Sequence, residues 1–370
     1  MVVAKILIPT KYNQDIRART MVTGGKTLGA AMEGHGAYNA NSGLQASGAA
    51  FALPLLIEAA NAIPLDGSSS PIVVADYGSS EGRNSIAVFK AVLPHLRARS
   101  ARPILVTHTD VPTNDFSTLF DLAAYDKGGY AGVDGIFASA VGRSFYESVL
   151  PRNYVHLGWS SYAVHWLSRP PSPVTGHFFS GCGQPHEREA FAEQARADWE
   201  MFLTLRSREL CAGGRLVIVV PAPFQKGAST LMPLYNAAND VLADMVHDGT
   251  LEGAEREAMV LPIHIRTLDE LLAPLAAHEL HAVAALIEKF GDGAHQEYQV
   301  SGDAAALAAR RAGFFRATFG PTLASALRRS DELDEGRSFL DQLESGLKRR
   351  LAGMTQSINS AVALLVLEKR

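Results

Sequence analysis

The chain has 370 residues, 19% of them charged, and a formal net charge of −4. This composition gives no strong positive field and no run of like charges, so DNA or RNA is not expected as the principal partner. The two cysteines, Cys182 and Cys211, cannot form a disulfide framework, which favours a reducing, cytoplasmic setting. No apolar stretch approaches the ~20 residues that span a membrane, and no cysteine and histidine spacing suits a metal ion. We therefore expect neither a membrane span nor a metal site.

In the first half of the chain, short apolar runs alternate with helical patterns, which is the order of βαβ units. We expect strands over residues 72–76, 104–109, 135–140, 154–157 and 215–220, and helices near residues 84–98 and 187–211. Gly213 and Gly214 predict the end of the second helix just before the last of these strands. Right-handed βαβ crossovers bring the carboxyl ends of parallel strands to one edge of the sheet, where a ligand site is expected.

The second half of the chain has a different pattern, with helical segments near residues 231–247, 268–274 and 304–327. These segments predict a helical cap over the sheet, and the apolar segment 361–367 predicts a last strand that closes one sheet edge. The expected fold is therefore α/β, a Rossmann-like sheet with a helical cap over the active site. The expected core comprises residues 67–226 and 282–370, and the expected cap comprises residues 227–281.

The strongest local signal follows the first predicted strand, where the sequence from Asp76 to Asn84 reads D-Y-G-S-S-E-G-R-N. Glycine in such a turn lets the backbone approach a ligand closely, and the Asp76 carboxylate can hold the amino-acid or ribose end of a cofactor. Asp110 ends the next strand, where a carboxylate can bind both ribose hydroxyls. Either residue alone also fits an ordinary strand end or helix N-cap, whereas two carboxylates on consecutive strand ends favour a nucleoside ligand.

The Asp76 segment resembles the first motif of class I S-adenosylmethionine (SAM) methyltransferases, and further segments make the resemblance more specific. Residues 34–45, GHGAYNANSGLQ, resemble G-x-x-S-Y-A-x-N-S-x-x-Q, and residues 110–116, DVPTNDF, resemble N-D-L-P-x-N-D-F. Residues 144–146, 150–153 and 160–168 resemble S-F-Y, F-P-x-N and S-S-Y-x-x-x-W-L-S. In this order the patterns are those of the SABATH family of SAM-dependent carboxyl methyltransferases, which the chain resembles over nearly its whole length.

This resemblance implies the class I SAM-dependent methyltransferase fold, SAM as the cofactor, S-adenosyl-L-homocysteine as its product, and a small carboxylic acid as the substrate. The positions that match cofactor-binding residues of the family are Tyr38, Ser42, Asp76, Gly78, Asn84, Asp110, Val111, Ser144 and Phe145. Gln45 and Trp166 match the pair that hydrogen-bonds the substrate carboxylate. The expected substrate pocket also includes Tyr162, His165, Tyr235 and Phe315. Residues 1–66 then contribute to both sites, and the family also implies a homodimer.

Some of these positions have a plainer interpretation without the resemblance. Trp166 on the apolar face of a helix would be a core residue, and Gln45 would be a surface helix residue. His165 suits a helix histidine as well as a ligand contact. Many family members carry lysine where this chain has Glu33, so a lysine contact to the carboxylate is not expected.

The implied reaction requires few catalytic groups from the protein. A carboxylic acid has a pKa near ~4, so it is already an anion at neutral pH and needs no general base. Catalysis then reduces to placing one carboxylate oxygen in line with the sulfonium methyl group in a water-poor pocket. The Gln45 amide and the Trp166 indole N–H are neutral donors that can orient this anion.

Other functions fit less well. A dehydrogenase would require G-x-G-x-x-G, which is absent, and residues 142–146 and 158–162 both lack the final glycine of the G-x-S-x-G motif of a serine hydrolase. Two alternatives stay open, N-methylation of a heterocycle beside His165 and Trp166 and a non-catalytic SAM-binding protein. The abundance of arginine and alanine favours a bacterial member. Because bacterial relatives that the chain resembles methylate free fatty acids, we expect a medium-chain fatty acid, with an aromatic acid such as salicylate or benzoate as the alternative.

Overall fold

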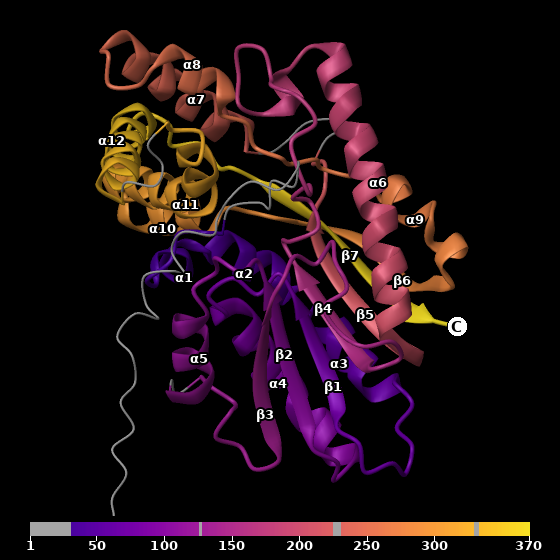
Figure 1. The fold of residues 1–370 in the computed structure, drawn as a ribbon. Coiled ribbons are helices and arrows are strands. Elements are labelled where there is room, and N and C mark those ends of the chain that lie inside the picture. The colour runs from indigo at the N-terminus through magenta and orange to yellow at the C-terminus, as the bar shows by residue number, and fades with distance from the viewer. Residues whose placement is uncertain (1–30, 126–127, 225–230, 329–332) are drawn as a thin grey trace, which may run out of the picture.

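The computed structural model describes residues 31–125, 128–224, 231–328 and 333–370. These residues form a mixed α/β fold around one seven-stranded sheet with the strand order β3-β2-β1-β4-β5-β7-β6 (Figure 1). The strands are β1 (Ile72–Tyr77), β2 (Ile104–Asp110), β3 (Ile136–Gly142), β4 (Val155–Ser161), β5 (Leu210–Pro221), β6 (Leu280–Phe290) and β7 (Ser360–Lys369). Residues 1–30 of the expected N-terminal segment and 227–230 of the expected cap lie outside the described residues.

The helices cover both faces of the sheet and its carboxyl edge (Figure 1). Around the sheet lie α3 (Leu53–Ala62), α4 (Arg83–Arg99), α5 (Phe116–Tyr125), α6 (Pro185–Glu209), α9 (Leu268–Leu272) and the 3₁₀ turn η2 (Leu275–His278). Toward the carboxyl edge lie α1 (Ala37–Asn41), α2 (Gly43–Ala50), η1 (Ser180–Cys182), α7 (Met232–His247), α8 (Gly253–Ala258), α10 (Gly293–Ser301), α11 (Ala304–Ala324) and α12 (Leu333–Leu351).

The five predicted strands β1 to β5 are confirmed, and they are parallel. β1 is buried along its whole length between β2 and β4, which explains its unbroken apolar run. Its side chains alternate between faces, so Val74 packs in the cluster of α3 and α4 while Tyr77 packs in the cluster of α6. The carboxyl ends of β1, β2 and β4 therefore meet at one edge, as the α/β prediction requires.

The last strand is not at the sheet edge, so that expectation was wrong. β7 pairs antiparallel with β5 on one side and with β6 on the other, and β6 forms the edge. β7 suits the inner position because eight of its ten residues are buried in succession. β6 was not predicted, since its pattern is irregular: it exposes Val283 and Ile287, and its register with β7 shifts between Ala282 and Ala284.

Gly213 and Gly214 do not end a helix, which corrects a second expectation. The helix α6 ends at Glu209, and both glycines lie inside β5. There the pairing with β4 jumps from Val155 opposite Leu210 to Leu157 opposite Arg215, so β5 bulges. Gly213 has a positive φ of 70°, and a Cβ on Gly214 would lie 3.0 Å from the carbonyl oxygen of Val155. The glycines therefore allow the bulge to form.

Three helices form the core of a separate helical layer. α7, α11 and α12 share one hydrophobic cluster with Phe178, Phe179 and Ile358. The predicted helices 231–247 and 304–327 correspond to α7 and α11, whereas α12 was not predicted. Residues 282–370 were expected in the core, but only β6 and β7 of that range join the sheet. α11 and α12 pack against α7, because their apolar faces are buried there. The helical layer thus extends beyond residue 281.

In the described part of the chain, no single helix is both long and apolar enough to cross a membrane. The consecutive helices α2 and α3 reach the length and composition only together, and they bend by 51° at the break between them.

Candidate active site

Two cavities lie next to each other at the carboxyl ends of β1, β2 and β4. They share Met32, Tyr38, Tyr162 and Trp166. The first, which we call the strand-end cavity, is lined by Ala31, Met32, Tyr38, Gly78, Ser80, Asp110, Val111, Ser144, Phe145, Tyr146, Ser161, Tyr162, Ala163, Trp166, Leu167 and Ser168. The second, which we call the aromatic cavity, is lined by Met32, Tyr38, Leu44, Gln45, Tyr162, His165, Trp166, Pro221, Ala222, Leu231, Tyr235, Ile265, Phe314, Thr318, Phe319, Ser360 and Ala361.

The turn after β1 brings backbone to the strand-end cavity. Gly78 has a φ of 89°, and a Cβ built on it would lie 2.4 Å from the Cβ of Ala163. Only glycine combines that conformation with that close approach. The N–H groups of Gly78 and Ser79 both donate to the carbonyl oxygen of Thr109, at 2.9 and 3.0 Å, so the turn is tied to the end of β2.

Asp110 lines the same cavity from the end of β2. Its carboxylate accepts the N–H groups of Ser80 at 2.7 Å and Val111 at 2.8 Å. Burial raises the pKa of Asp110 to about 6, although these two hydrogen bonds oppose the shift. Asp110 is therefore ionised at neutral pH, as a carboxylate that accepts ribose hydroxyls must be.

Three predicted cofactor residues, Ser42, Asp76 and Asn84, do not line the strand-end cavity. Asn84 donates its Nδ2 to the Ser42 hydroxyl oxygen at 3.2 Å. Asp76 is fully buried, with Oδ2 at 2.7 Å from Nδ1 of His108 and with no hydrogen-bond partner for Oδ1 among the described residues. A buried carboxylate oxygen without a partner is costly in a protein interior.

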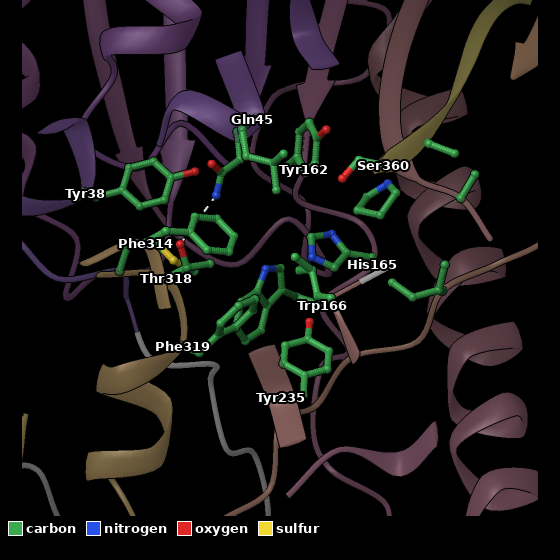
Figure 2. Close-up of a pocket in the computed structure, with 17 residues that line it drawn as sticks. Tyr38, Gln45, Tyr162, His165, Trp166, Tyr235, Phe314, Thr318, Phe319 and Ser360 are labelled. Atoms are coloured by element: carbon green, nitrogen blue, oxygen red, sulfur yellow. Dashed lines mark hydrogen bonds between the residues drawn. The ribbon is translucent and has the colours of Figure 1, made fainter. Parts of the chain in front are cut away.

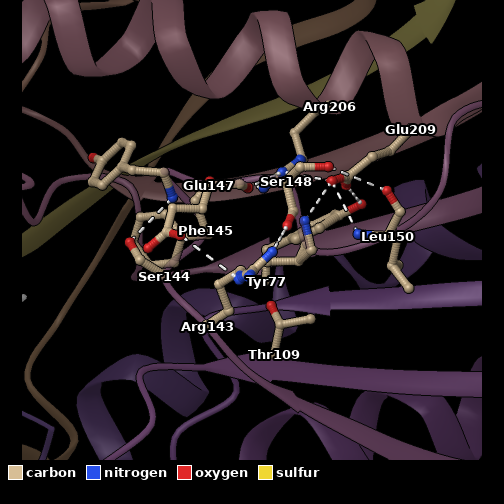
Figure 3. Close-up of polar contacts among 12 residues, drawn as sticks. Tyr77, Thr109, Arg143, Ser144, Phe145, Glu147, Ser148, Leu150, Arg206 and Glu209 are labelled. Atoms are coloured by element: carbon tan, nitrogen blue, oxygen red, sulfur yellow. Dashed lines mark hydrogen bonds and ion pairs between the residues drawn. The ribbon is translucent and has the colours of Figure 1, made fainter.

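The loop after β3 carries Ser144 and Phe145 and is fixed by a buried ion pair from α6 (Figure 3). Arg206 donates to the carbonyl oxygens of Phe145 at 2.8 Å and Glu147 at 3.0 Å, and it pairs with Glu209 at 3.0 Å. Glu209 in turn accepts the N–H groups of residues 149 and 150 and the hydroxyl of Tyr77, which precedes Gly78. The pair thus connects two segments of the strand-end cavity. Sequence reasoning missed it, although charged residues on an otherwise buried helix face are a usable signal.

A second unpredicted contact connects α1 to the turn after β1. The buried carboxylate of Glu81 accepts the N–H groups of Gly36 at 2.6 Å and Asn39 at 3.0 Å. The Asn39 side chain accepts the N–H of Arg83 at 3.2 Å in return. These bonds hold the segment with Tyr38 against the cofactor turn, since Tyr38 lies within the same short helix.

The aromatic cavity contains a neutral hydrogen-bonding pair. Gln45 is buried on α2, its Nε2 donates to the Thr318 hydroxyl at 3.4 Å, and its Oε1 has no partner among the described residues. Figure 2 shows the Gln45 amide and the Trp166 indole nitrogen pointing toward the same space. Among the described lining residues, none has a carboxylate or a cationic Lys or Arg side chain. An anion in this cavity would therefore be bound by neutral donors.

The local structure around Trp166 differs from the sequence-based interpretations. Trp166 and His165 lie in a turn after β4 rather than on a helix, and Trp166 forms an isolated bridge with Ile263. Tyr162 starts this turn with a left-handed φ of 52°. Its hydroxyl approaches α2 so closely that a Cβ on Gly48 would lie 2.1 Å from it. Gln45 is likewise not a surface residue, because this turn covers α2.

His165 lines the aromatic cavity as a neutral group. Burial lowers the pKa of His165 to about 3, and the nearby Arg266 guanidinium adds to the effect. Its Nδ1 has no hydrogen-bond partner among the described residues. It can therefore exchange hydrogen bonds with a ligand but does not neutralise an anion.

Of the two remaining predicted pocket residues, the structure places one in the cavity lining and the other behind it. Tyr235 lines the aromatic cavity, whereas Phe315 does not, because it is fully buried behind Tyr235 and Phe319, with ring centroids 6.5 and 5.3 Å away. The neighbouring Phe314 and Thr318, four residues apart on α11, face the cavity instead. The prediction that Phe315 lines the pocket was therefore wrong, because the adjacent residue Phe314 faces the cavity instead.

Glu33, which stands where many family members have lysine, is held away from both cavities. Its carboxylate accepts the Nε of Arg316 at 3.0 Å, and Arg316 also pairs with Asp341 and Glu344. Glu33 does not line either cavity. It connects the start of the described chain to α11.

Taken together, the sheet order, the glycine turn and the ionised Asp110 fit a nucleoside cofactor. SAM is such a cofactor. In the described residues no group of three or more histidine, cysteine, aspartate or glutamate side chains could hold a metal ion. The fold and the adjoining cavities define a class I SAM-dependent methyltransferase.

Comparisons with known proteins agree with this class. A family model described as SAM dependent carboxyl methyltransferase matches residues 28–370. The protein named Methyltransferase FUS9 of Gibberella fujikuroi is 32% identical over 243 residues, which is 65% of this chain and 65% of that relative's length. Salicylate/benzoate carboxyl methyltransferase of Arabidopsis thaliana is 29% identical over 65% of this chain and 67% of its own length. A solved structure, loganic acid methyltransferase with SAH, aligns with a TM-score of 0.73 and 20% identity over 92% of this chain and 98% of that one.

The chain therefore belongs to the family of SAM-dependent carboxyl methyltransferases, and SAM is its cofactor. The structural likeness at 20% identity supports the fold alone. The homodimer and the cytoplasmic setting stay predictions.

Proposed function

We propose that this protein transfers the methyl group of SAM to the carboxylate of a hydrophobic acid, giving the methyl ester, with Gln45 and Trp166 orienting the carboxylate. The observation that supports it is the shared wall between the two cavities. Tyr38, Tyr162 and Trp166 border both, so an acid held by Gln45 and Trp166 would lie next to a cofactor in the strand-end cavity.

The reaction needs no general base from this site. Bound SAM would supply an electrophilic methyl group on a sulfonium. The substrate acid, with a pKa near ~4, enters as the nucleophilic anion, so no proton has to be removed. Neutral donors suit this step better than a lysine, because they orient the anion without neutralising the charge that attacks. The buried aromatic lining excludes water, which favours a transfer that cancels charge.

For the substrate we keep a medium-chain aliphatic acid as the first candidate. The lining beyond the donor pair consists mainly of apolar and aromatic side chains, including Leu44, Phe314 and Phe319. Each methylene buried there would contribute roughly 0.8 kcal/mol. A flat aromatic acid is the second candidate, because Trp166 and Phe319 present tilted rings with centroids 5.9 Å apart, against which a ring can pack.

A panel assay with methyl-labelled SAM tests the proposal. The panel contains free acids of about six to sixteen carbons, salicylate and benzoate, with xanthines as the nitrogen control. Methyl esters that peak at one chain length support the aliphatic acid, and methyl salicylate or benzoate alone supports the aromatic one. Labelled xanthine without any ester would overturn the proposal in favour of N-methylation. No product despite measured SAM binding would point to a non-catalytic SAM-binding protein.

A further inference from the structure

A third cavity, which we call the outer cavity, adjoins the aromatic cavity on the side of the helical layer. It lies between α2, α10, α11 and the start of α7. It encloses about 1140 Å³ including its opening to solvent, against about 680 Å³ measured in the same way for the aromatic cavity. The two cavities share three apolar residues, Leu44, Leu231 and Phe314. A single layer of side chains therefore separates them.

Helix α11 shows how the cavities are arranged. Arg310, Phe314 and Thr318 are spaced four residues apart and lie along one face of the helix. Arg310 lines the outer cavity, Thr318 lines the aromatic cavity, and Phe314 lines both. The row thus runs from the opening of one cavity to the Gln45 side chain in the other, since Gln45 contacts Thr318.

The other two walls repeat this order. On α2, Gln45 lines the aromatic cavity, Leu44 lines both and Ser47 lines the outer cavity. At the start of α7 the corresponding residues are Tyr235, Leu231 and Leu234. Three separate segments therefore place the same kind of apolar partition between the same two spaces.

We propose that the outer cavity is a subsite for the far end of the acid, so that the preferred substrates are longer than the aromatic cavity and pass the partition at Phe314. This inference rests on the proposed carboxyl methylation. A carboxylate at Gln45 and Trp166 leaves the rest of the molecule only the direction away from the strand-end cavity, and the described walls place the outer cavity there.

The lining of the outer cavity indicates what kind of end it takes. Its charges are already paired, Arg311 with Asp292 at 2.8 Å and Arg310 with Glu297 at 2.9 Å. Ser47 is exposed at the opening. Among the described lining residues no charge is unpaired while hydrogen-bonding groups are available, so the cavity suits an uncharged end, apolar or hydroxylated. The predicted substrate class is a carboxylic acid with an apolar middle and a hydrophobic or hydroxylated far end.

The test compares kcat/KM for acids of about six to sixteen carbons in four proteins, with the long-to-short ratio as the readout. Ser47→Trp fills the outer cavity from an exposed position and should lower the ratio about tenfold or more, since each lost methylene contact costs about fourfold. Ala46→Trp, on the adjacent exposed position outside the lining, should keep the wild-type ratio. Phe314→Ala removes the partition and should shift the preferred chain length upward. A hydroxyl at the far end of a long acid should change turnover by less than about tenfold.

The possible outcomes separate the two proposals. If short acids are methylated and neither Ser47→Trp nor Phe314→Ala changes the ratio, the subsite is wrong while carboxyl methylation stands. If both variants change the rates for all lengths equally, the outer cavity is an entry route and the subsite is again wrong. If no acid of any length is methylated, the proposed function itself fails. Binding of the same acids to the SAH-loaded protein, measured by calorimetry, gives the ratio independently of turnover.

Discussion

The strand-end cavity and the aromatic cavity share a wall but are built in different ways. Gly78 directly follows β1, Asp110 is the last residue of β2 and Ser144 lies two residues after β3, so the sheet itself places them. Gln45 and Thr318 meet across 273 residues of sequence, and the packing of the helical layer determines their distance. The first cavity is therefore expected to depend on backbone conformation, and the second on individual side chains.

The largest effect is expected where backbone conformation alone matters. Gly78→Ala would place a residue with a side chain in a left-handed backbone conformation, which costs about 1–2 kcal/mol. The new Cβ would also clash with the side chain of Ala163. SAM affinity should fall about 100-fold or more, measured by calorimetry. Gly176→Ala is the matched control, because Gly176 has a similar φ of 74° with open space around it. If Gly78→Ala bound SAM as tightly as that control does, the backbone account of the strand-end cavity would be wrong.

The second largest effect should change turnover of the acid and leave SAM binding nearly unchanged. Trp166→Phe keeps an aromatic ring but removes the indole N–H, and losing one hydrogen bond to a charged group costs about 1.5–3 kcal/mol. We expect kcat/KM for the acid to fall roughly 10- to 100-fold while the Kd of SAM stays within about threefold. Full activity of this variant on every acid would refute the role given to Trp166.

The pH dependence of SAM binding tests Asp110. Because the pKa of Asp110 is raised to about 6, affinity should be constant above that pH and fall below it, approaching tenfold per pH unit. Because folding raises the pKa of Asp110, the ionised carboxylate lowers the free energy of unfolding of the unliganded protein. This loss of stability is absent at pH values below the pKa that Asp110 has in the unfolded chain. Asp110→Asn has one acceptor oxygen in place of two and no charge, so it should bind SAM weakly at every pH. A wild-type affinity that stays constant down to about pH 5 would contradict the assignment.

The smallest effect is expected at the hydrogen bond between Gln45 on α2 and Thr318 on α11. Thr318→Val keeps the shape of the side chain but removes the acceptor for the Gln45 amide. One neutral hydrogen bond contributes about 0.5–1.5 kcal/mol, and this one is long at 3.4 Å, so KM for the acid should rise only about threefold. Thr318→Ser restores the hydroxyl and should restore KM. An equal change in SAM affinity would show that the two cavities are not independent.

The contrast between the two cavities also explains which parts of the structure could be predicted from the sequence. Parallel strands leave unbroken apolar runs, so β1 to β5 and the residues at their ends could be predicted. The order of β6 and β7 could not, because β6 lacks a clear period and antiparallel pairing at the edge leaves no local mark.

The aromatic cavity was harder to predict because its residues depend on tertiary packing. The resemblance selected Gln45 and Trp166, but the turn that carries Trp166 depends on the left-handed Tyr162 and on its fit against Gly48. Phe314 and Phe315 are adjacent and chemically identical, so only the rotation of α11 decides which one faces the cavity. Likewise, Arg206 and Glu209 stand out as charged residues on a buried helix face, but the local sequence does not show that they contact the loop after β3.

The most direct test of the central claim is the site of methylation on a substrate that has both a carboxylate and a hydroxyl, chosen from the acids that the panel shows to be turned over. The account predicts the methyl ester alone, because the carboxylate is already ionised and His165, whose pKa is lowered to about 3, is too weak a base to activate a hydroxyl. A methyl ether as the main product, identified by mass spectrometry, would require a general base and would contradict the assignment of the aromatic cavity.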